Sequence, residues 1–163
     1  MSFLRLFGAG ALLLSAIFVS GEYSKFLDRR ISEYRGIVSL LSHAEEGIER
    51  SLSYGGRLWQ SFEDEALERC GLLELLREGK GLSAAFCQCK DKLVLTKEAR
   101  DRIAEELSAL GRGYMSGEIA KLSALRRKIE DELSAMQTDT EKSKKVARAL
   151  LIGGALALGV MII

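Results

Sequence analysis

Residues 107–163 read LSALGRGYMSGEIAKLSALRRKIEDELSAMQTDTEKSKKVARALLIGGALALGVMII, the most strongly patterned part of the sequence. It begins with a hinge at Leu110-Gly111 and ends with an uncharged apolar run, residues 149–163. Between them, apolar residues recur three or four positions apart, which places them on one face of a helix. These residues are Ile119, Leu122, Leu125, Ile129, Leu133 and Met136. The stretch predicts a long amphipathic helix that continues into an apolar segment.

Four basic residues stand immediately before the apolar run. They are Lys142, Lys144, Lys145 and Arg148. Basic side chains beside a membrane segment are attracted to anionic lipid headgroups. We expect these four to contact lipid headgroups rather than nucleic acid, because the whole chain has a net charge of only +1.

The N-terminal end of the chain is also apolar, since residues 6–21 carry no charge. A transmembrane helix needs about 20 apolar residues, so residues 1–21 are close to the lower limit. A cleaved signal peptide is the alternative, because Val19 and Gly21 fit the small-residue positions of a cleavage site. Basic residues follow this segment and precede the C-terminal one, so the positive-inside rule favours two retained anchors and a cytoplasmic middle region.

Composition indicates the fold class. The 163 residues include no proline, and no stretch alternates apolar and polar residues as a half-buried strand does. We therefore predict an all-α protein, in which a cytoplasmic helical bundle lies between two transmembrane helices. The predicted ranges are 1–21 for the first transmembrane helix, 22–146 for the bundle and 147–163 for the second transmembrane helix.

A heptad-like stripe predicts that residues 22–53 form one long helix. Its apolar positions are Leu27, Ile31, Tyr34, Val38, Leu41, Ile48 and Leu52. Glu45 occupies the slot between Leu41 and Ile48. It either marks a solvent-facing edge of the stripe, or is a polar residue that specifies register or receives a basic partner residue. Since both long helices enter the membrane from the same side, we expect 22–53 and 117–146 to pack together.

Glycine pairs divide the region between the long helices. Gly55-Gly56 and Gly79-Lys80-Gly81 predict turns, and Leu58, Trp59 and Phe62 open a helix in which Glu63, Asp64 and Glu65 form a solvated face. A short helix then carries Leu82, Ala85, Phe86 and Cys89 on one side. Thr96 is placed to cap a further helix. The buried stripe of that helix is Ala99, Ile103, Leu107 and Leu110.

Few residues in the sequence suggest chemistry. Cys70, Cys87, Cys89 and His43 could supply a zinc site, but their spacing does not match the usual paired ligands. Buried free cysteines are the alternative interpretation. The sequence contains no phosphate-binding glycine loop and no nucleophile–base arrangement, so we expect neither an enzyme nor a cofactor. The basic triplet Arg126-Arg127-Lys128 is either a solvated face or part of a partner surface.

The order of these features resembles the stage III sporulation protein AB family of endospore-forming Firmicutes. The resemblance covers nearly the whole chain and includes a glutamate three residues before an isoleucine, here Glu45 and Ile48, and the hinge Leu110-Gly111. Some positions depart from the family pattern. Arg57-Leu58 stands in place of Pro-Leu, Tyr114 in place of Asp and Glu118 in place of Gln.

The resemblance implies a non-enzymatic role in the channel complex that the mother cell builds toward the forespore. Its expected partners are a cytoplasmic sporulation ATPase encoded nearby and other membrane proteins of the complex, with a homo-oligomer also possible. The family's cytoplasmic region is similar to that of the platform protein of type II secretion and type IV pili. Expected partner-binding residues are Glu45, Ile48, Leu110, Gly111, Glu118, Arg126 and Arg127. The alternative function is a membrane-tethered helical scaffold for division or envelope proteins.

Overall fold

The computed structural model describes residues 2–49, 56–110 and 115–162; for most residues near the two chain ends it describes the backbone alone. This part of the chain is helical and contains no strand, as predicted. The elements are α1 (Ser2–Glu49), α2 (Gly56–Trp59), α3 (Glu65–Arg69), α4 (Leu72–Arg77), α5 (Leu82–Cys89), the 3₁₀ helix η1 (Lys90–Lys92), α6 (Lys97–Ser108) and α7 (Met115–Ile162).

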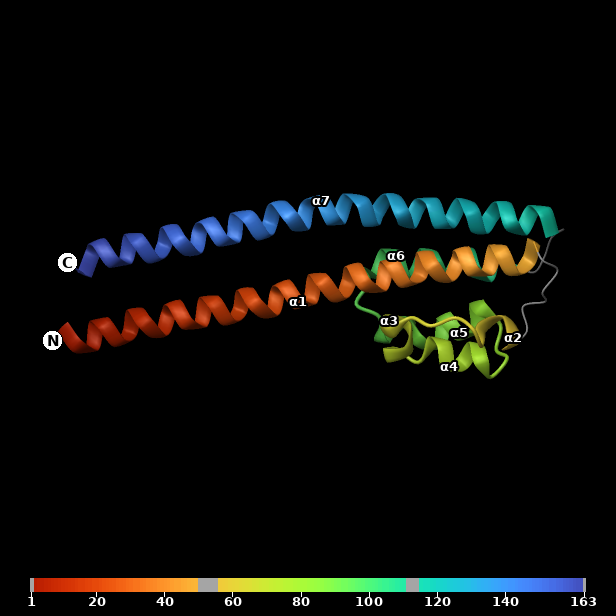
Figure 1. The fold of residues 1–163 in the computed structure, drawn as a ribbon, viewed down its shortest axis with the longest axis horizontal. Helices are drawn as coiled ribbons and strands as arrows, with labels where there is room; N and C mark the ends of the chain where they lie inside the picture. The colour runs from red at the N-terminus through yellow and green to blue at the C-terminus, as the bar shows by residue number, and fades with distance from the viewer. Residues whose placement is uncertain (1, 50–55, 111–114, 163) are drawn as a thin grey trace. The chain divides into compact units, whose positions relative to one another are not determined.

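The chain divides into two compact units. Unit 1 comprises residues 1–28 and 135–163, and unit 2 comprises residues 29–134. Helices α1 and α7 each contain 48 residues and run without interruption through both units. In unit 2, the short helices α2–α5 gather on one side of α1, and α7 lies on the other side (Figure 1).

Helix α1 is buried more widely than one stripe. Four predicted stripe residues, Leu27, Tyr34, Leu41 and Ile48, are buried, but Ile37, Leu40 and Ala44 are buried as well. The reason is that unit 2 covers α1 from two directions. His43 bonds to the carbonyl oxygen of Leu58 at 2.8 Å, and Glu45 pairs with Arg126 of α7 at 3.0 Å. A single amphipathic stripe cannot anticipate this double contact, because it assumes one buried face.

Two glycines let the short helices approach α1 closely. A Cβ at Gly47 would lie 2.5 Å from Leu58 Cδ1, and a Cβ at Gly36 would lie 2.7 Å from Asp64 Oδ1. Both distances are shorter than van der Waals contact, so only glycine fits at these positions of α1 without a shift in its neighbours.

The single helix predicted to open at Leu58 is wrong. Helix α2 ends at Trp59, and Asp64 starts α3 by accepting a hydrogen bond from the Leu67 amide at 2.9 Å. Asp64 is therefore an N-cap and not part of a solvated helix face. Gly71, with φ of +82°, separates α3 from α4, which is a conformation that glycine adopts at little cost.

The turn predicted at Gly79 is confirmed. Gly79 has φ of +88°, and its amide donates to Leu76 O at 3.0 Å, while the Lys80 amide donates to Leu75 O at 3.1 Å. These two bonds form a Schellman motif that ends α4.

The predictions for α5 and for the start of α6 are also confirmed. Leu82, Ala85, Phe86 and Cys89 are all buried, and the Thr96 hydroxyl accepts from the Ala99 amide at 3.2 Å. The other end of α6 was predicted wrongly. The helix stops at Ser108 and Leu110 is only half-buried, because a tight bond from the Leu110 amide to Leu107 O turns the chain.

The expected membrane anchors remain predictions. Among the residues that the structure describes in full, no helix has a stretch long and apolar enough to cross a membrane. Nearly all side chains of residues 1–21 and 147–163 lie outside that set.

Candidate functional site

The candidate site is the set of residues expected to bind a partner, and the structure places most of them inside unit 2. Glu45 of α1 accepts a hydrogen bond from Arg126 Nε of α7 at 3.0 Å, and Arg126 NH1 also binds Glu130 at 2.7 Å. The side chains of Glu45 and Arg126 are 15% and 24% exposed. Of the two interpretations of Glu45, the structure therefore supports the one in which it receives a basic residue, here from the same chain.

Two carboxylates bind Arg126, and both stabilise its charged form. Hydrogen bonds from Arg126 to Glu45 and to Glu130 raise the pKa of the Arg126 guanidinium. Because arginine is charged at any physiological pH, Arg126 stays a cation toward both carboxylates. Arg126 is thus used internally and is not a free partner contact.

Two further expected contacts, Ile48 and Glu118, are buried, with exposed fractions of 5% and 6%. Their side chains belong to the interior of unit 2 and not to its surface. Leu110 is half-buried, and Gly111 lies outside the described residues. Arg127 is exposed on α7. Among the described members of the expected set, it is the residue best placed to meet a partner.

A second polar link joins three helices. The Tyr34 hydroxyl of α1 donates to Glu132 of α7 at 3.4 Å, and Arg102 of α6 forms an ion pair with the same carboxylate. Lys128 of α7 pairs with Glu106 of α6 at 2.7 Å. Sequence reasoning missed these contacts, because Tyr34 was assigned to an apolar stripe and the charged residues have the ordinary composition of a solvated helix face.

A polar cluster near the start of unit 2 was also missed. Glu33 is 1% exposed, accepts a hydrogen bond from the Val94 amide, and is paired with Arg29 at 3.3 Å. Arg30 Nε donates to Val94 O at 3.0 Å. The one available signal was the spacing of Arg29, Arg30 and Glu33 over one turn of α1, which also fits an exposed ion pair.

The cysteines and the histidine do not converge. Cys70 and Cys89 are buried, Cys87 is exposed, and His43 packs against the rings of Trp59 and Phe62 at 6.0 and 5.2 Å between centroids. Burial raises the pKa of the Cys70 and Cys89 thiols. Within the described ranges, which include all four residues, no three His, Cys, Asp or Glu side chains are grouped closely enough to hold a metal ion.

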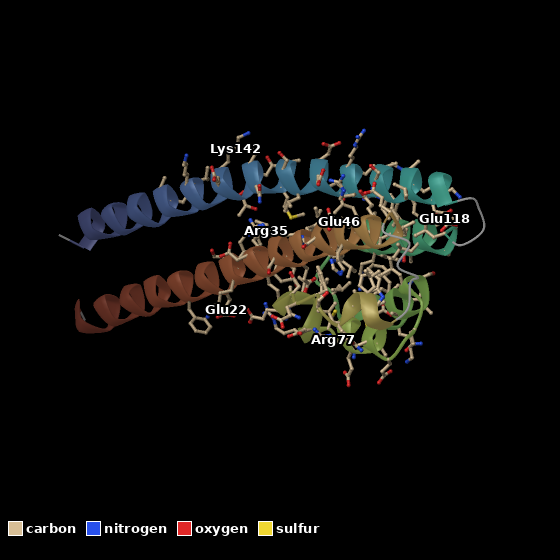
Figure 2. The ribbon with its side chains drawn as sticks, turned by 45° about the vertical axis from the view of Figure 1, so that its right-hand side comes forward. Glu22, Arg35, Glu46, Arg77, Glu118 and Lys142 are labelled. Carbon is tan, nitrogen blue, oxygen red and sulfur yellow. The ribbon has the colours of Figure 1, made fainter. Side chains whose placement is uncertain are left out.

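A shallow depression of about 550 Å³ lies on the surface of α3 and α4. Glu68, Glu74, Arg77 and Glu78 line it. Figure 2 shows Arg77 among the short helices, where its NH2 group donates to Phe62 O at 2.8 Å and to Glu68 at 3.0 Å. Three glutamates and one arginine make the lining of the depression acidic, and these four residues include no nucleophile with a neighbouring general base.

The residues expected to contact lipid lie on α7 in unit 1. Lys142 and Lys145 are exposed, and Lys142 points outward from the helix (Figure 2). The side chains of Lys144 and Arg148 lie outside the described set.

No protein-family model matches the chain, and neither a curated protein nor a solved structure shows significant similarity to it.

Proposed function

We propose that this protein is a non-enzymatic membrane platform in the channel complex between mother cell and forespore, where it couples a cytoplasmic ATPase to the membrane assembly. The proposal places it in the mother-cell membrane around the forespore, with two spans and a cytoplasmic middle region. One observation carries it most directly. Both apolar chain ends lead through unbroken 48-residue helices into a packed, polar-surfaced domain.

The distribution of exposed apolar side chains supports a membrane setting. The large apolar side chains that are exposed within the described residues are Phe18, Tyr23, Phe26, Val146 and Leu150, and all five belong to unit 1. Exposed apolar surface of this kind marks contact with a membrane or a partner. Among the described residues of unit 2 no large apolar side chain is exposed, and this polar surface suits an aqueous compartment.

The polar links in unit 2 support a coupling role. A part that passes a displacement from an ATPase to a membrane assembly must keep its helices in a fixed register. Glu45–Arg126 joins α1 to α7, and Tyr34–Glu132–Arg102 joins α1, α6 and α7 at a second position. Directional polar contacts specify register better than apolar contacts alone.

The proposal is tested by co-purification of the full-length protein, in detergent or nanodiscs, with the sporulation ATPase encoded near it. We expect a stable complex that Arg127→Glu weakens at least tenfold. Lys97→Glu is the matched control, because Lys97 is exposed on α6 and the change in charge is the same. It is expected to bind like the parent.

Absence of binding by a folded and membrane-inserted protein would overturn the proposal. Expression throughout vegetative growth, together with capture of division or envelope proteins, would favour the scaffold alternative instead. Equal weakening by Arg127→Glu and Lys97→Glu would show that net charge, and not the α7 surface, controls binding.

A further inference from the structure

Two exposed aromatic residues of unit 1 directly follow the charge-free segment of α1. Tyr23 and Phe26 of α1 are 59% and 43% exposed, and they follow the uncharged residues 6–21. Phe18, inside that segment, is 71% exposed. Aromatic rings with one apolar and one polar environment concentrate at the boundary between hydrocarbon and headgroups.

The register of the two long helices places basic residues at the same level as Tyr23. The Tyr34–Glu132 and Glu45–Arg126 contacts show that α1 and α7 run antiparallel. Tyr23 lies eleven residues before Tyr34, and Ser143 lies eleven residues after Glu132. At 1.5 Å per residue, both are about 16 Å along their helices from the same contact. Counted from that contact, Tyr23 is level with Ser143, between Lys142 and Lys145, and counted from the Glu45–Arg126 contact it is level with Arg148, so both counts place it beside the basic residues of α7.

Beyond this level both helices expose apolar side chains. Val146 and Leu150 of α7 are 58% and 71% exposed, and on α1 the corresponding residue is Phe18. On the opposite side of this position, away from the apolar segments, both helices carry charged side chains. On α1, the first acidic residue, Glu22, is paired with Lys25 at 2.8 Å, which reduces its repulsion of an anionic surface.

We propose that Tyr23, Phe26, Lys142 and Lys145 form an aromatic and basic ring that binds the headgroup layer of an anionic phospholipid bilayer and sets how deeply unit 1 inserts. The inference rests on the membrane placement of the proposed function, and it adds the aromatic residues of α1 to the expected lipid contacts and assigns them the control of depth. The lysines favour lipid over a second copy of the chain, because two rings of the same positive sign would repel each other.

The ring is tested with full-length Tyr23→Trp protein in vesicles containing brominated phosphatidylglycerol or brominated phosphatidylcholine. Bromine quenches tryptophan fluorescence on close contact. Trp59, the one natural tryptophan, is fully buried in unit 2, and the parent protein gives its background. We expect the anionic lipid to quench the reporter at least twofold more than the zwitterionic lipid. Charge reversal by Lys142→Glu with Lys145→Glu should abolish that preference without loss of quenching.

Ala124→Trp is the control reporter, because Ala124 is exposed on α7 about 27 Å from Lys142 along the helix. It should show only the Trp59 background. Two results would overturn the ring. One is equal quenching of Tyr23→Trp by both lipids. The other is no quenching by either lipid, which is the result that shielding by a second copy of the chain would give. If the protein also washes off the vesicles in alkaline carbonate, the membrane platform fails with it, whereas resistance to carbonate leaves the platform standing.

Discussion

Glu33 of α1 and Val94 are 61 residues apart in sequence, yet the Glu33 carboxylate accepts the backbone N–H of Val94. Arg30, one turn earlier on α1, donates to the carbonyl oxygen of the same residue at 3.0 Å. Both backbone groups of Val94 are thus bound by α1 side chains. Since Leu93 and Leu95 on either side are buried, the connection between η1 and α6 is fixed to α1 by polar and apolar contacts together.

Removal of the Glu33 carboxylate is expected to destabilise unit 2. Glu33→Ala leaves the Val94 amide without its acceptor and should lower the free energy of unfolding by about 1–3 kcal/mol. Glu33→Gln keeps an acceptor oxygen and should cost less. The measurement is urea unfolding in detergent followed by the fluorescence of Trp59. Equal losses for the two variants would show that the hydrogen bond to Val94 does not control stability.

The Glu33 carboxylate should also make the free energy of unfolding depend on pH. Burial raises the pKa of Glu33, although the Val94 amide and Arg29 oppose this shift. Arg69 also faces the carboxylate and opposes it. The folded protein therefore binds this proton more tightly than the unfolded chain, so a fall in pH through the interval between the raised pKa and the ordinary glutamate value, about 4.3, stabilises the folded state.

The Glu33→Gln variant has no titratable group at this position, so comparison with it isolates the contribution of Glu33 to the pH dependence of stability. Relative to that variant, the parent protein should gain stability as the pH is lowered from 7.5 through that interval, and lose it as the pH rises again through the raised pKa. Urea midpoints at several pH values, measured for both proteins, check the sign. A relative loss of parent stability at lower pH contradicts a raised pKa for Glu33.

Thiol reactivity should separate the three cysteines. Cys87 is exposed, whereas Cys70 and Cys89 are buried and their pKa values are raised by that burial. The thiolate is the reactive form, so N-ethylmaleimide at pH 7.5 should label Cys87 rapidly and the other two only after unfolding. Mass spectrometry of native and urea-treated protein counts the labels. Three labels on the native protein at equal rates would mean that the interior around Cys70 and Cys89 opens readily.

The same sample tests the zinc interpretation. Metal analysis of the purified protein should find no stoichiometric zinc, because the His43 ring is bound to Leu58 O and the cysteines lie apart from it. Stoichiometric zinc that protects Cys70 and Cys89 from the label would reverse this conclusion.

Elements with a strong local signal were predictable from sequence. Thr96 is a favourable N-cap, and the spacing of Leu82, Ala85, Phe86 and Cys89 has no competing interpretation. Asp64 was predicted wrongly because an aspartate within an acidic run fits an exposed helix face and an N-cap equally well. Only the short connection after Trp59, which tertiary packing imposes, distinguishes the two.

Pairings between distant residues were not predictable. Tyr34–Glu132–Arg102 and Glu33–Val94 depend on which helices meet and in what register, and periodicity within one helix holds no information about either. Glu45 was a partial exception, because a carboxylate inside an apolar stripe either faces solvent or has a partner, and the sequence left both interpretations open. The identity of that partner, Arg126, still came only from the packing of α1 against α7.

The change in stability caused by replacing a glycine with alanine should depend on the space available for the added methyl group. Gly36→Ala places a methyl group against the Asp64 carboxylate, which already caps α3, and should cost about 1–2 kcal/mol through loss of the cap. Gly47→Ala meets the buried Leu58 and should cost about 1–3 kcal/mol. Leu58→Ala in the same chain should make the second substitution less costly. Thermal or urea unfolding monitored at Trp59 measures each variant.

Gly117→Ala is the matched control, because nothing lies within 4 Å of the new methyl group on helix α7. It should stabilise the protein by about 1 kcal/mol, since alanine favours helix over glycine. If Gly36→Ala and Gly47→Ala were as stable as Gly117→Ala, the close approach of the short helices to α1 would be absent in solution.

A double-mutant cycle should show how strongly Glu45 and Arg126 join α1 to α7. The pair is less exposed than a surface ion pair, which contributes about 0.2–1 kcal/mol, and less enclosed than a buried pair, whose disruption costs about 3–5 kcal/mol. We expect a coupling energy of about 1–2 kcal/mol from Glu45→Gln, Arg126→Gln and the double variant. Arg126→Gln should be the costlier single change, because Glu130 still binds Arg126 when Glu45 is lost.

The exposed pair Lys25–Glu22, with side chains 76% and 57% exposed, is the control and should show no measurable coupling. Added salt at 1 M should leave most of the Glu45–Arg126 coupling intact, since partly buried pairs are screened less than exposed ones. A coupling energy near zero would mean that Glu45 is a solvent-facing edge of the stripe after all. In that case the apolar residues around it, and not the ion pair, would fix the register of α1 and α7.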